Sequence, residues 1–175
     1  VNVNDGAGKP IADAVVFLES AAAKSAIKVQ EGIEVAQELK QFVPSVTVVP
    51  IGSLVRFPNR DTVRHHVYSF STAKKFELKL YTGTPANPVL FDRAGVVVLG
   101  CNIHDHMAAW VVVVETPYFG KTNASGEINL GQVPPGSYKL RTWHSGFLVG
   151  ASAQEQPLIV ASSNVTNAVV KVVLP

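Results

Sequence analysis

Apolar residues along this chain occur in short runs, and Gly, Pro and Asn separate these runs at close spacing. Phe76, Leu78 and Leu80 alternate with polar residues, and this period of two is typical of a half-buried β-strand. Val is abundant and helix signals are weak, so the spacing predicts an all-β protein built as an antiparallel sandwich or barrel. The predicted strands lie within residues 1–3, 12–20, 45–49, 53–57, 65–71, 76–81, 95–101, 109–115, 134–143 and 167–174, with a hairpin turn at 123–126.

Residues 25–42 do not follow one clear period. Ile33, Leu39 and Phe42 fit helical spacing and strand spacing equally well. We expect an extended segment here, with room for a short helix.

Length and charge narrow the classes of protein that this sequence fits. With 175 residues the chain is long enough for one large domain or two small ones. The net charge is only +2 and no Lys/Arg run exceeds Lys74-Lys75, so a nucleic-acid-binding surface is not expected. The apolar run Met107–Val114 falls far short of the roughly 18 to 20 residues that span a bilayer, so we expect no membrane span.

The single cysteine and the single methionine lie close together, at Cys101 and Met107, with His104 between them. Four of the five histidines form two pairs, His65/His66 and His104/His106. A thiolate, a thioether and two imidazoles are the soft donors of a trigonal copper site with a weak axial Met. With one cysteine there is no disulfide within the chain, so Cys101 acts as a thiol, a thiolate or a ligand.

Two other interpretations of these residues remain open. Zinc would leave its fourth position to Asp105 or water, and Met107 would then have no role. An enzyme with an open metal position could use Asp105 or His106 as a general base. We disfavour an enzyme, because a closed site with four protein donors leaves no place for a substrate.

The C-x-x-H-x-x-M loop at residues 101–107 resembles the cupredoxin family, its amicyanin and plastocyanin branch in particular. Upstream, "NRDTVRHHV" is similar to the stretch that supplies the first copper ligand in that family, and the resemblance spans residues 33–115. It implies a Greek-key β-sandwich that binds one copper ion per chain. By the same resemblance the equatorial ligands are His65, Cys101 and His104, and Met107 is the axial ligand.

Four positions depart from the family pattern. His66 stands where amicyanin and plastocyanin have Asn, Ile103 stands where they have Pro, and Asp105-His106 makes the loop more polar. Adjacent strand residues point to opposite faces, so His66 is expected to lie outside the ligand set. Whether His66 or His106 also binds a metal stays open.

Both ends of the chain resemble a second family. Residues 1–18, "VNVNDGAGKPIADAVVFL", and residues 121–140, "KTNASGEINLGQVPPGSYKL", are similar to the two halves of a transthyretin-like or carboxypeptidase-regulatory-like module. This resemblance implies a smaller immunoglobulin-like β-sandwich formed by residues 1–24 and 116–175, with a cupredoxin domain at 25–115 between them. The rival is a tandem arrangement in which residues 1–24 add only an edge strand.

The whole chain also resembles periplasmic methylamine-utilisation-type, plastocyanin-like proteins of bacteria. This implies a type 1 (blue) copper protein that carries one electron in the periplasm, with a dehydrogenase or cytochrome as redox partner. Copper sequestration or delivery in the periplasm is the alternative. The chain opens at Val1 in strand-like sequence, which fits a trimmed chain or one whose signal peptide has been removed.

Overall fold

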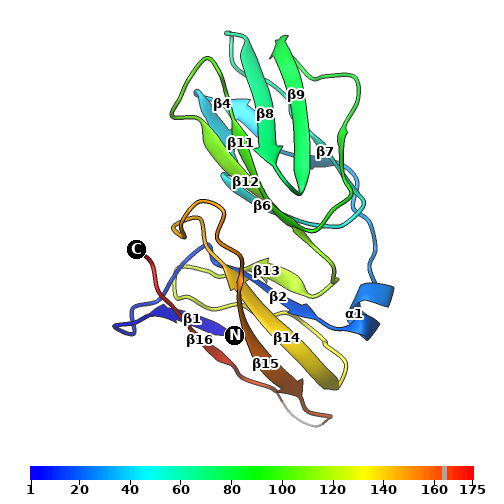
Figure 1. Ribbon diagram of the computed structural model, residues 1–175, viewed down its shortest axis with the longest axis vertical. Coiled ribbons are helices and arrows are strands. Elements are labelled where there is room, and N and C mark those ends of the chain that lie inside the picture. Colours follow the sequence, from blue (N-terminus) through cyan, green and yellow to red (C-terminus); the bar gives the residue numbers. More distant parts are fainter. Residues whose placement is uncertain (163–164) are drawn as a thin grey trace. The chain divides into compact units, whose positions relative to one another are not determined.

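The computed structural model describes residues 1–162 and 165–175, and it is all-β apart from one short helix (Figure 1). The chain separates into two compact units. We call Lys28–Val114 the central unit, and Val1–Ile27 together with Glu115–Pro175 the terminal unit. The predicted all-β class is confirmed.

The central unit contains two facing sheets and a separate hairpin. The larger sheet has the order β6-β12-β11-β8-β9, the smaller has the order β10-β7-β3, and β4 pairs with β5. The bounds are β3 Ile33–Glu34, β4 Ala36–Glu38, β5 Gln41–Val43, β6 Val46–Pro50, β7 Ser53–Arg56, β8 His65–Ser71, β9 Lys74–Tyr81, β10 Val89–Phe91, β11 Gly95–Gly100 and β12 Ala108–Val114. All pairs in the larger sheet are antiparallel except β12 with β6.

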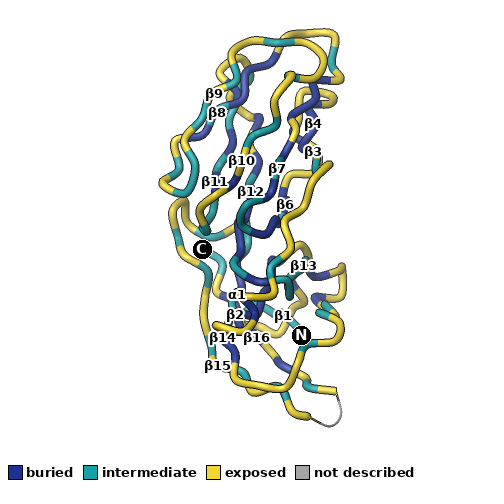
Figure 2. Tube along the Cα trace, turned by 90° about the vertical axis from the view of Figure 1, so that its right-hand side faces the viewer, coloured by how far each residue is buried: buried dark blue, intermediate teal, exposed yellow. Residues whose placement is uncertain are grey.

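One apolar core joins the sheets of the central unit. Alternate residues of β11 and β12, such as Val97, Leu99 and Val111, are fully buried on one face. They belong to the same cluster as Val55 of β7 and Phe91 of β10 in the smaller sheet. Two sheets that share one core form a sandwich, as the predicted cupredoxin-type architecture requires. Figure 2 shows buried positions following these strands.

The terminal unit has its own sheets and its own core. A four-stranded sheet has the order β13-β2-β14-β15, and β1 pairs with β16 in parallel. The bounds are β1 Asn2–Asp5, β2 Val15–Glu19, β13 Phe119–Lys121, β14 Gly136–Trp143, β15 Gln154–Val160 and β16 Val169–Val172. Val3, Leu18, Leu140 and Val170 lie in one buried cluster, so both ends of the chain contribute to this core.

The only helix among the described residues is α1, Ala21–Ser25, and it overlaps the ambiguous stretch 25–42 only at Ser25. Ser20 caps it by accepting a hydrogen bond from the N–H of Ala23. Residues 33–43 form β3, β4 and β5, so the extended interpretation of this part is confirmed and the helical one is wrong. No helix in the described parts of the chain has the length and apolar character needed to cross a membrane.

Three strands were not predicted, namely β10, β13 and β15. β10 and β13 have three residues each, too few to show a period. β15 is an edge strand with a proline and several exposed polar residues, a composition that weakens a strand signal. The predicted turn at 123–126 is present, with Gly126 N–H donating to the Asn123 carbonyl, but Glu127 forms only an isolated bridge with Asn2.

Candidate metal centre

Three neighbouring strands of the larger sheet bring the candidate ligands together. His65 opens β8, Cys101 follows the last residue of β11, and Met107 directly precedes β12. β11 lies between β8 and β12 and runs antiparallel to both, so its end lies beside their beginnings. The loop 101–107 therefore starts and finishes next to His65, although 36 residues separate His65 from Cys101.

His65, Cys101 and His104 form a compact donor cluster. One nitrogen from each ring and the Cys101 sulfur all lie within 4.8 Å of one another. Cys101 Sγ is 3.9 Å from His65 Nδ1, and the two imidazole rings have centroids 5.1 Å apart. His65 is 0% exposed and Cys101 is 3% exposed, whereas His104 is half-buried. The donors thus meet in a protected site with one imidazole toward the surface.

Met107 lies at the inner end of the same loop. It is 2% exposed and belongs to the apolar cluster that also contains Cys101. Its backbone N–H donates to the His104 carbonyl at 3.0 Å, which closes residues 104–107 into a turn. The turn joins the backbone of residue 107 to that of His104, and the role of the thioether as a ligand stays a prediction.

The orientation of the two rings fits a bound cation. His65 Nε2 lies 2.7 Å from Asp61 Oδ2, so Nδ1 is the nitrogen that faces Cys101. His104 Nδ1 is buried and has no hydrogen-bond partner among the described residues. A buried polar atom without a partner costs about 1–3 kcal/mol, and a metal ion at this point would remove that cost.

The electrostatic surroundings of His104 favour the neutral imidazole that a metal requires. Burial lowers the pKa of His104, and the nearby His65, Lys40 and His106 lower it further, with Asp61 acting weakly in the other direction. A neutral ring has one nitrogen with a free lone pair, which a metal ion can bind. A thiolate and two neutral imidazoles can hold a soft or borderline metal ion.

Asp61 was missed by the sequence analysis, yet it contacts the first candidate ligand directly. Burial opposes ionisation of this carboxylate, but the N–H groups of Lys40 and Leu39 and the ring of His65 outweigh burial and lower the pKa of Asp61. Asn59 shapes the same loop by donating to the carbonyls of Val63 and Tyr81 and accepting from the Asp61 N–H. In the sequence, the signal for this contact was a carboxylate four residues before His65.

His66 lies outside the donor cluster, as expected. The β8–β9 register shifts between His65 and Val67, and irregularities of this kind re-aim side chains beside functional sites. His66 Nδ1 accepts a hydrogen bond from the side-chain amide of Asn102 at 3.2 Å, and its Nε2 lies 2.9 Å from Glu77 without the alignment of a hydrogen bond. His66 thereby ties β8 to the residue after Cys101.

His106 also lies outside the donor cluster. It is exposed, its ring meets that of His104 edge-on at 6.0 Å, and its Nε2 lies 3.1 Å from the Lys40 carbonyl oxygen. A carbonyl oxygen only accepts, so this nitrogen carries a proton. His106 therefore anchors the outer side of the ligand loop to the turn that contains Lys40.

Two tyrosines lie on the strands beside the cluster: Tyr68 belongs to β8, and Tyr81 of β9 pairs with His65. A Cβ at Gly100 would lie 2.7 Å from the Tyr68 ring, so any residue other than glycine before Cys101 would force this ring to shift. Burial raises the pKa of Tyr81 to about 12, a hydrogen bond from Gln37 acts weakly against this, and the charge of Cys101 adds to it. The Tyr81 hydroxyl is thus a neutral donor to the Phe57 carbonyl at 2.7 Å.

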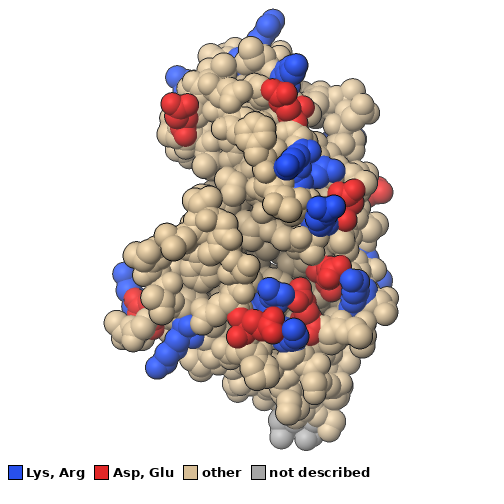
Figure 3. All heavy atoms as spheres, viewed as in Figure 1, with Lys and Arg blue, Asp and Glu red and all other residues tan. Residues whose placement is uncertain are grey.

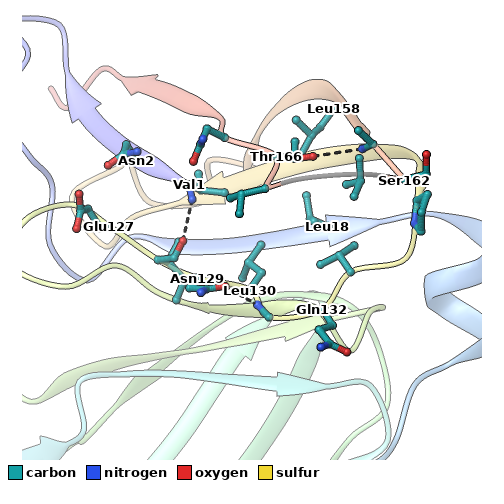
Figure 4. Close-up of a pocket in the computed structure, with 18 of the residues that line it drawn as sticks. Val1, Asn2, Leu18, Glu127, Asn129, Leu130, Gln132, Leu158, Ser162 and Thr166 are labelled. Carbon is teal, nitrogen blue, oxygen red and sulfur yellow. Dashed lines mark hydrogen bonds between the residues drawn. The ribbon is translucent and has the colours of Figure 1, made fainter.

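A separate cavity of about 830 Å³ lies in the terminal unit and contains none of the candidate ligands. Figure 4 shows Leu18, Leu130 and Leu158 around it, together with polar side chains such as Gln132. Acidic and basic residues are interspersed on the face drawn in Figure 3, and neither sign dominates it. Neither feature points to a defined ligand.

No family model matches this chain, and no curated protein matches it. Among solved structures, it is similar to a copper-containing nitrite reductase from Thermus scotoductus SA-01, with 22% identity, a TM-score of 0.44 and coverage of 47% of this chain and 22% of that one. This chain therefore spans about a fifth of the reductase.

Two smaller proteins are also similar to this chain. A purple cupredoxin from Nitrosopumilus maritimus shows 19% identity over 47% of this chain and 99% of its own, with a TM-score of 0.41. The reduced copper(I) form of an amicyanin variant shows 21% identity over 57% of this chain and 98% of its own, with a TM-score of 0.43. These values are low, so the assignment of the metal centre rests on the side chains of this chain.

Proposed function

We propose that the central unit binds one copper ion through His65, Cys101, His104 and Met107, and that the chain is a type 1 (blue) copper protein carrying one electron at a time. The observation that carries this proposal is the convergence of the Cys101 sulfur with one nitrogen from each of two histidine rings. A buried nitrogen of His104, Nδ1, has no hydrogen-bond partner among the described residues. The donor types match the soft set that selects copper.

Each side chain has a distinct part in this proposal. Cys101 supplies the thiolate, and the buried ring of His65 supplies a nitrogen that Asp61 orients. The half-buried His104 links the site to the surface, where a redox partner would approach. Copper bound there would supply a Cu(I)/Cu(II) couple. Because the sheet fixes the ends of β8, β11 and β12, the donors would move little between the two states.

The test is a visible absorption spectrum after adding Cu(II) to the full chain. The unaltered protein should show an intense sulfur-to-copper charge-transfer band, and Cys101→Ala should lose it. His144→Ala is the matched control, since it removes a histidine of the terminal unit and should keep the band. A band that survives in a folded Cys101→Ala protein contradicts the proposal, as does tight copper binding without any such band in the unaltered chain.

Copper sequestration or delivery is the second candidate function. The observation in its favour is the presence of His106, an exposed imidazole 6.0 Å from the His104 ring, which could take part in metal transfer. This function predicts more than one copper per chain and rapid loss of copper to a chelator. Measuring the copper-to-protein ratio and the rate of transfer to a Cu(I) chelator separates it from electron transfer, which needs one firmly held ion.

Further parts of the proposal rest on the resemblances given above. We place the protein in the periplasm with a dehydrogenase or cytochrome as its redox partner, and we assign residues 25–115 to a cupredoxin domain. We assign residues 1–24 and 116–175 to a transthyretin-like module, which the sheet β13-β2-β14-β15 and the 123–126 turn support. A non-enzymatic role fits a site in which His65 and Cys101 are at most 3% exposed.

A further inference from the structure

A two-residue turn outside the donor cluster contacts both segments that carry the candidate ligands. Leu39 and Lys40 connect β4 to β5, and both have positive φ angles, 52° and 57°. The N–H groups of Leu39 and Lys40 donate to Asp61 Oδ1 and Oδ2 at 2.7 and 2.9 Å. On its other side, the Lys40 carbonyl accepts from His106 in the ligand loop at 3.1 Å.

Asp61 also determines the state of the His65 ring. Its Oδ2 lies 2.7 Å from His65 Nε2, and an ionised carboxylate only accepts hydrogen bonds. The proton of the neutral ring therefore sits on Nε2, which leaves the lone pair on Nδ1 facing Cys101. Carboxylates that accept from the outer nitrogen of a ligating histidine fix its tautomer and orientation in metal sites generally.

We propose that Asp61 is the positioning residue of this metal centre, because it holds the His65 ring in the tautomer that can bind a metal. Through the Leu39–Lys40 turn, Asp61 also connects the segment that carries His65 to His106 in the loop 101–107. This inference rests on the proposed function of the site. Asp61 also places a negative charge beside a ligand, and that charge favours the more positive oxidation state of a bound metal. The reduction potential of the unaltered protein is accordingly lower than that of a variant without the charge.

A purely structural role for Asp61 would have different consequences. A structural clasp would stabilise the β4–β5 turn, but the potential and the His65 tautomer would not depend on its charge. Asp61→Asn tests this directly, because the amide is nearly isosteric and one oxygen can still accept from a neighbour. The matched control is Asp92→Asn, which removes the same charge from an exposed carboxylate paired with Lys74.

Asp92 suits this comparison because of its place in the central unit. Its partner Lys74 pairs with Ser71 at the end of β8, six residues along the strand from His65. At about 3.3 Å per residue that distance is roughly 20 Å, beyond the screening length at ordinary ionic strength. Removing the charge of Asp92 should therefore leave the reduction potential of the copper site unchanged.

The experiment has a metal-free part and a copper-loaded part, both on the full chain. In the metal-free protein, ¹⁵N NMR of the histidine rings should show His65 protonated at Nε2, in the unaltered chain and in Asp92→Asn alike. In Asp61→Ala that tautomer preference should be lost, and the amide protons of Leu39 and Lys40 should exchange faster with solvent. In the copper-loaded protein, Asp61→Asn should have a higher reduction potential than the unaltered chain and Asp92→Asn.

The outcomes separate this inference from the proposed function. If the unaltered chain shows no copper band, the proposed function fails, and the metal-free His65 tautomer still decides the role of Asp61. A His65 ring protonated at Nδ1 in the unaltered chain, or one unaffected by loss of Asp61, overturns the inference. The inference is also overturned if folded Asp61→Asn has the same reduction potential as the unaltered chain. If Asp61→Ala does not fold, the His65 tautomer of the unaltered chain and the potential of Asp61→Asn still decide the inference.

Discussion

At the scale of single residues, the metal centre depends on where ring nitrogens and sulfur atoms point. His104 Nδ1 is buried without a hydrogen-bond partner among the described residues, and His65 Nδ1 faces the Cys101 sulfur because Asp61 occupies the other ring nitrogen. A buried imidazole nitrogen without a partner is unfavourable unless a ligand is bound. These orientations, more than the presence of the residues, favour a metal site.

Met107→Leu tests the proposed axial ligand. Leu has nearly the volume of Met, so the core should lose less than about 1.5 kcal/mol of stability. We expect the charge-transfer band to remain, because Cys101 is its proposed source. The reduction potential should rise, because a weak axial donor would stabilise Cu(II) more than Cu(I) and tune the potential. Spectroelectrochemistry measures both quantities.

The control for this variant is Leu99→Met, an equivalent swap at a fully buried position of the same core. It should leave the potential unchanged. An unaltered potential in Met107→Leu would show that the thioether only fills space beside the site.

At the scale of elements, strand order and one hairpin bring the residues of the site together. β11 lies between β8 and β12, which places the start of β8 beside the loop 101–107. The β4–β5 hairpin then reaches both ligand segments through the backbone of its turn. The backbone makes these contacts, so side chains in the turn can change while the contacts remain.

Leu39→Asn with Lys40→Gly should stabilise the central unit. Both turn positions have positive φ, which costs about 1–2 kcal/mol per L-residue and which Asn-Gly tolerates in two-residue hairpins. Leu39 is 85% exposed, so its replacement loses little burial. We expect a gain of about 1 kcal/mol in the free energy of unfolding, after the larger entropy loss of Gly, measured by urea denaturation.

Lys40→Ala is the matched comparison for the turn, because it removes the long side chain but keeps a Cβ at the same φ. It should show no gain. Equal stability of Lys40→Ala and of the double variant Leu39→Asn with Lys40→Gly would mean that the side chains do not strain the turn.

At the scale of the whole molecule, the chain contains two units with separate cores, and all four candidate ligands belong to one of them. A ligand that binds only the folded state stabilises the unit that binds it, by an amount that grows with the logarithm of ligand concentration. The two units should therefore respond differently to metal.

Calorimetry of the full chain with and without copper tests this separation. Copper should raise the melting temperature of the central unit and leave that of the terminal unit unchanged. Leu140→Ala empties a 1%-exposed position in the core of the terminal unit and should cost that unit about 2–5 kcal/mol while keeping the copper-dependent shift. Leu99→Ala, in the core of the central unit, should lower the melting temperature of the central unit and leave that of the terminal unit unchanged. A single unfolding transition whose melting temperature shifts with copper and with both variants would show that the two units unfold together.

Predictions from the sequence are confirmed where the signal is local. The alternation in residues 76–81 predicted β9, and the turn at 123–126 was recognised from its Asn and Gly. β15 was missed because an edge strand tolerates proline and exposed polar residues, so its composition resembles a loop. The fold family assigned to the terminal unit stays a prediction.

By itself, the sequence determined the all-β class and the local spacing of Cys101, His104 and Met107, because strand periodicity and a seven-residue loop involve only near neighbours. Only the tertiary structure decided that His65 lies beside that loop, that Asp61 orients its ring, and that the Leu39–Lys40 turn contacts both ligand segments. These contacts join residues up to 66 positions apart, and strand order, which local patterns do not encode, brings them together.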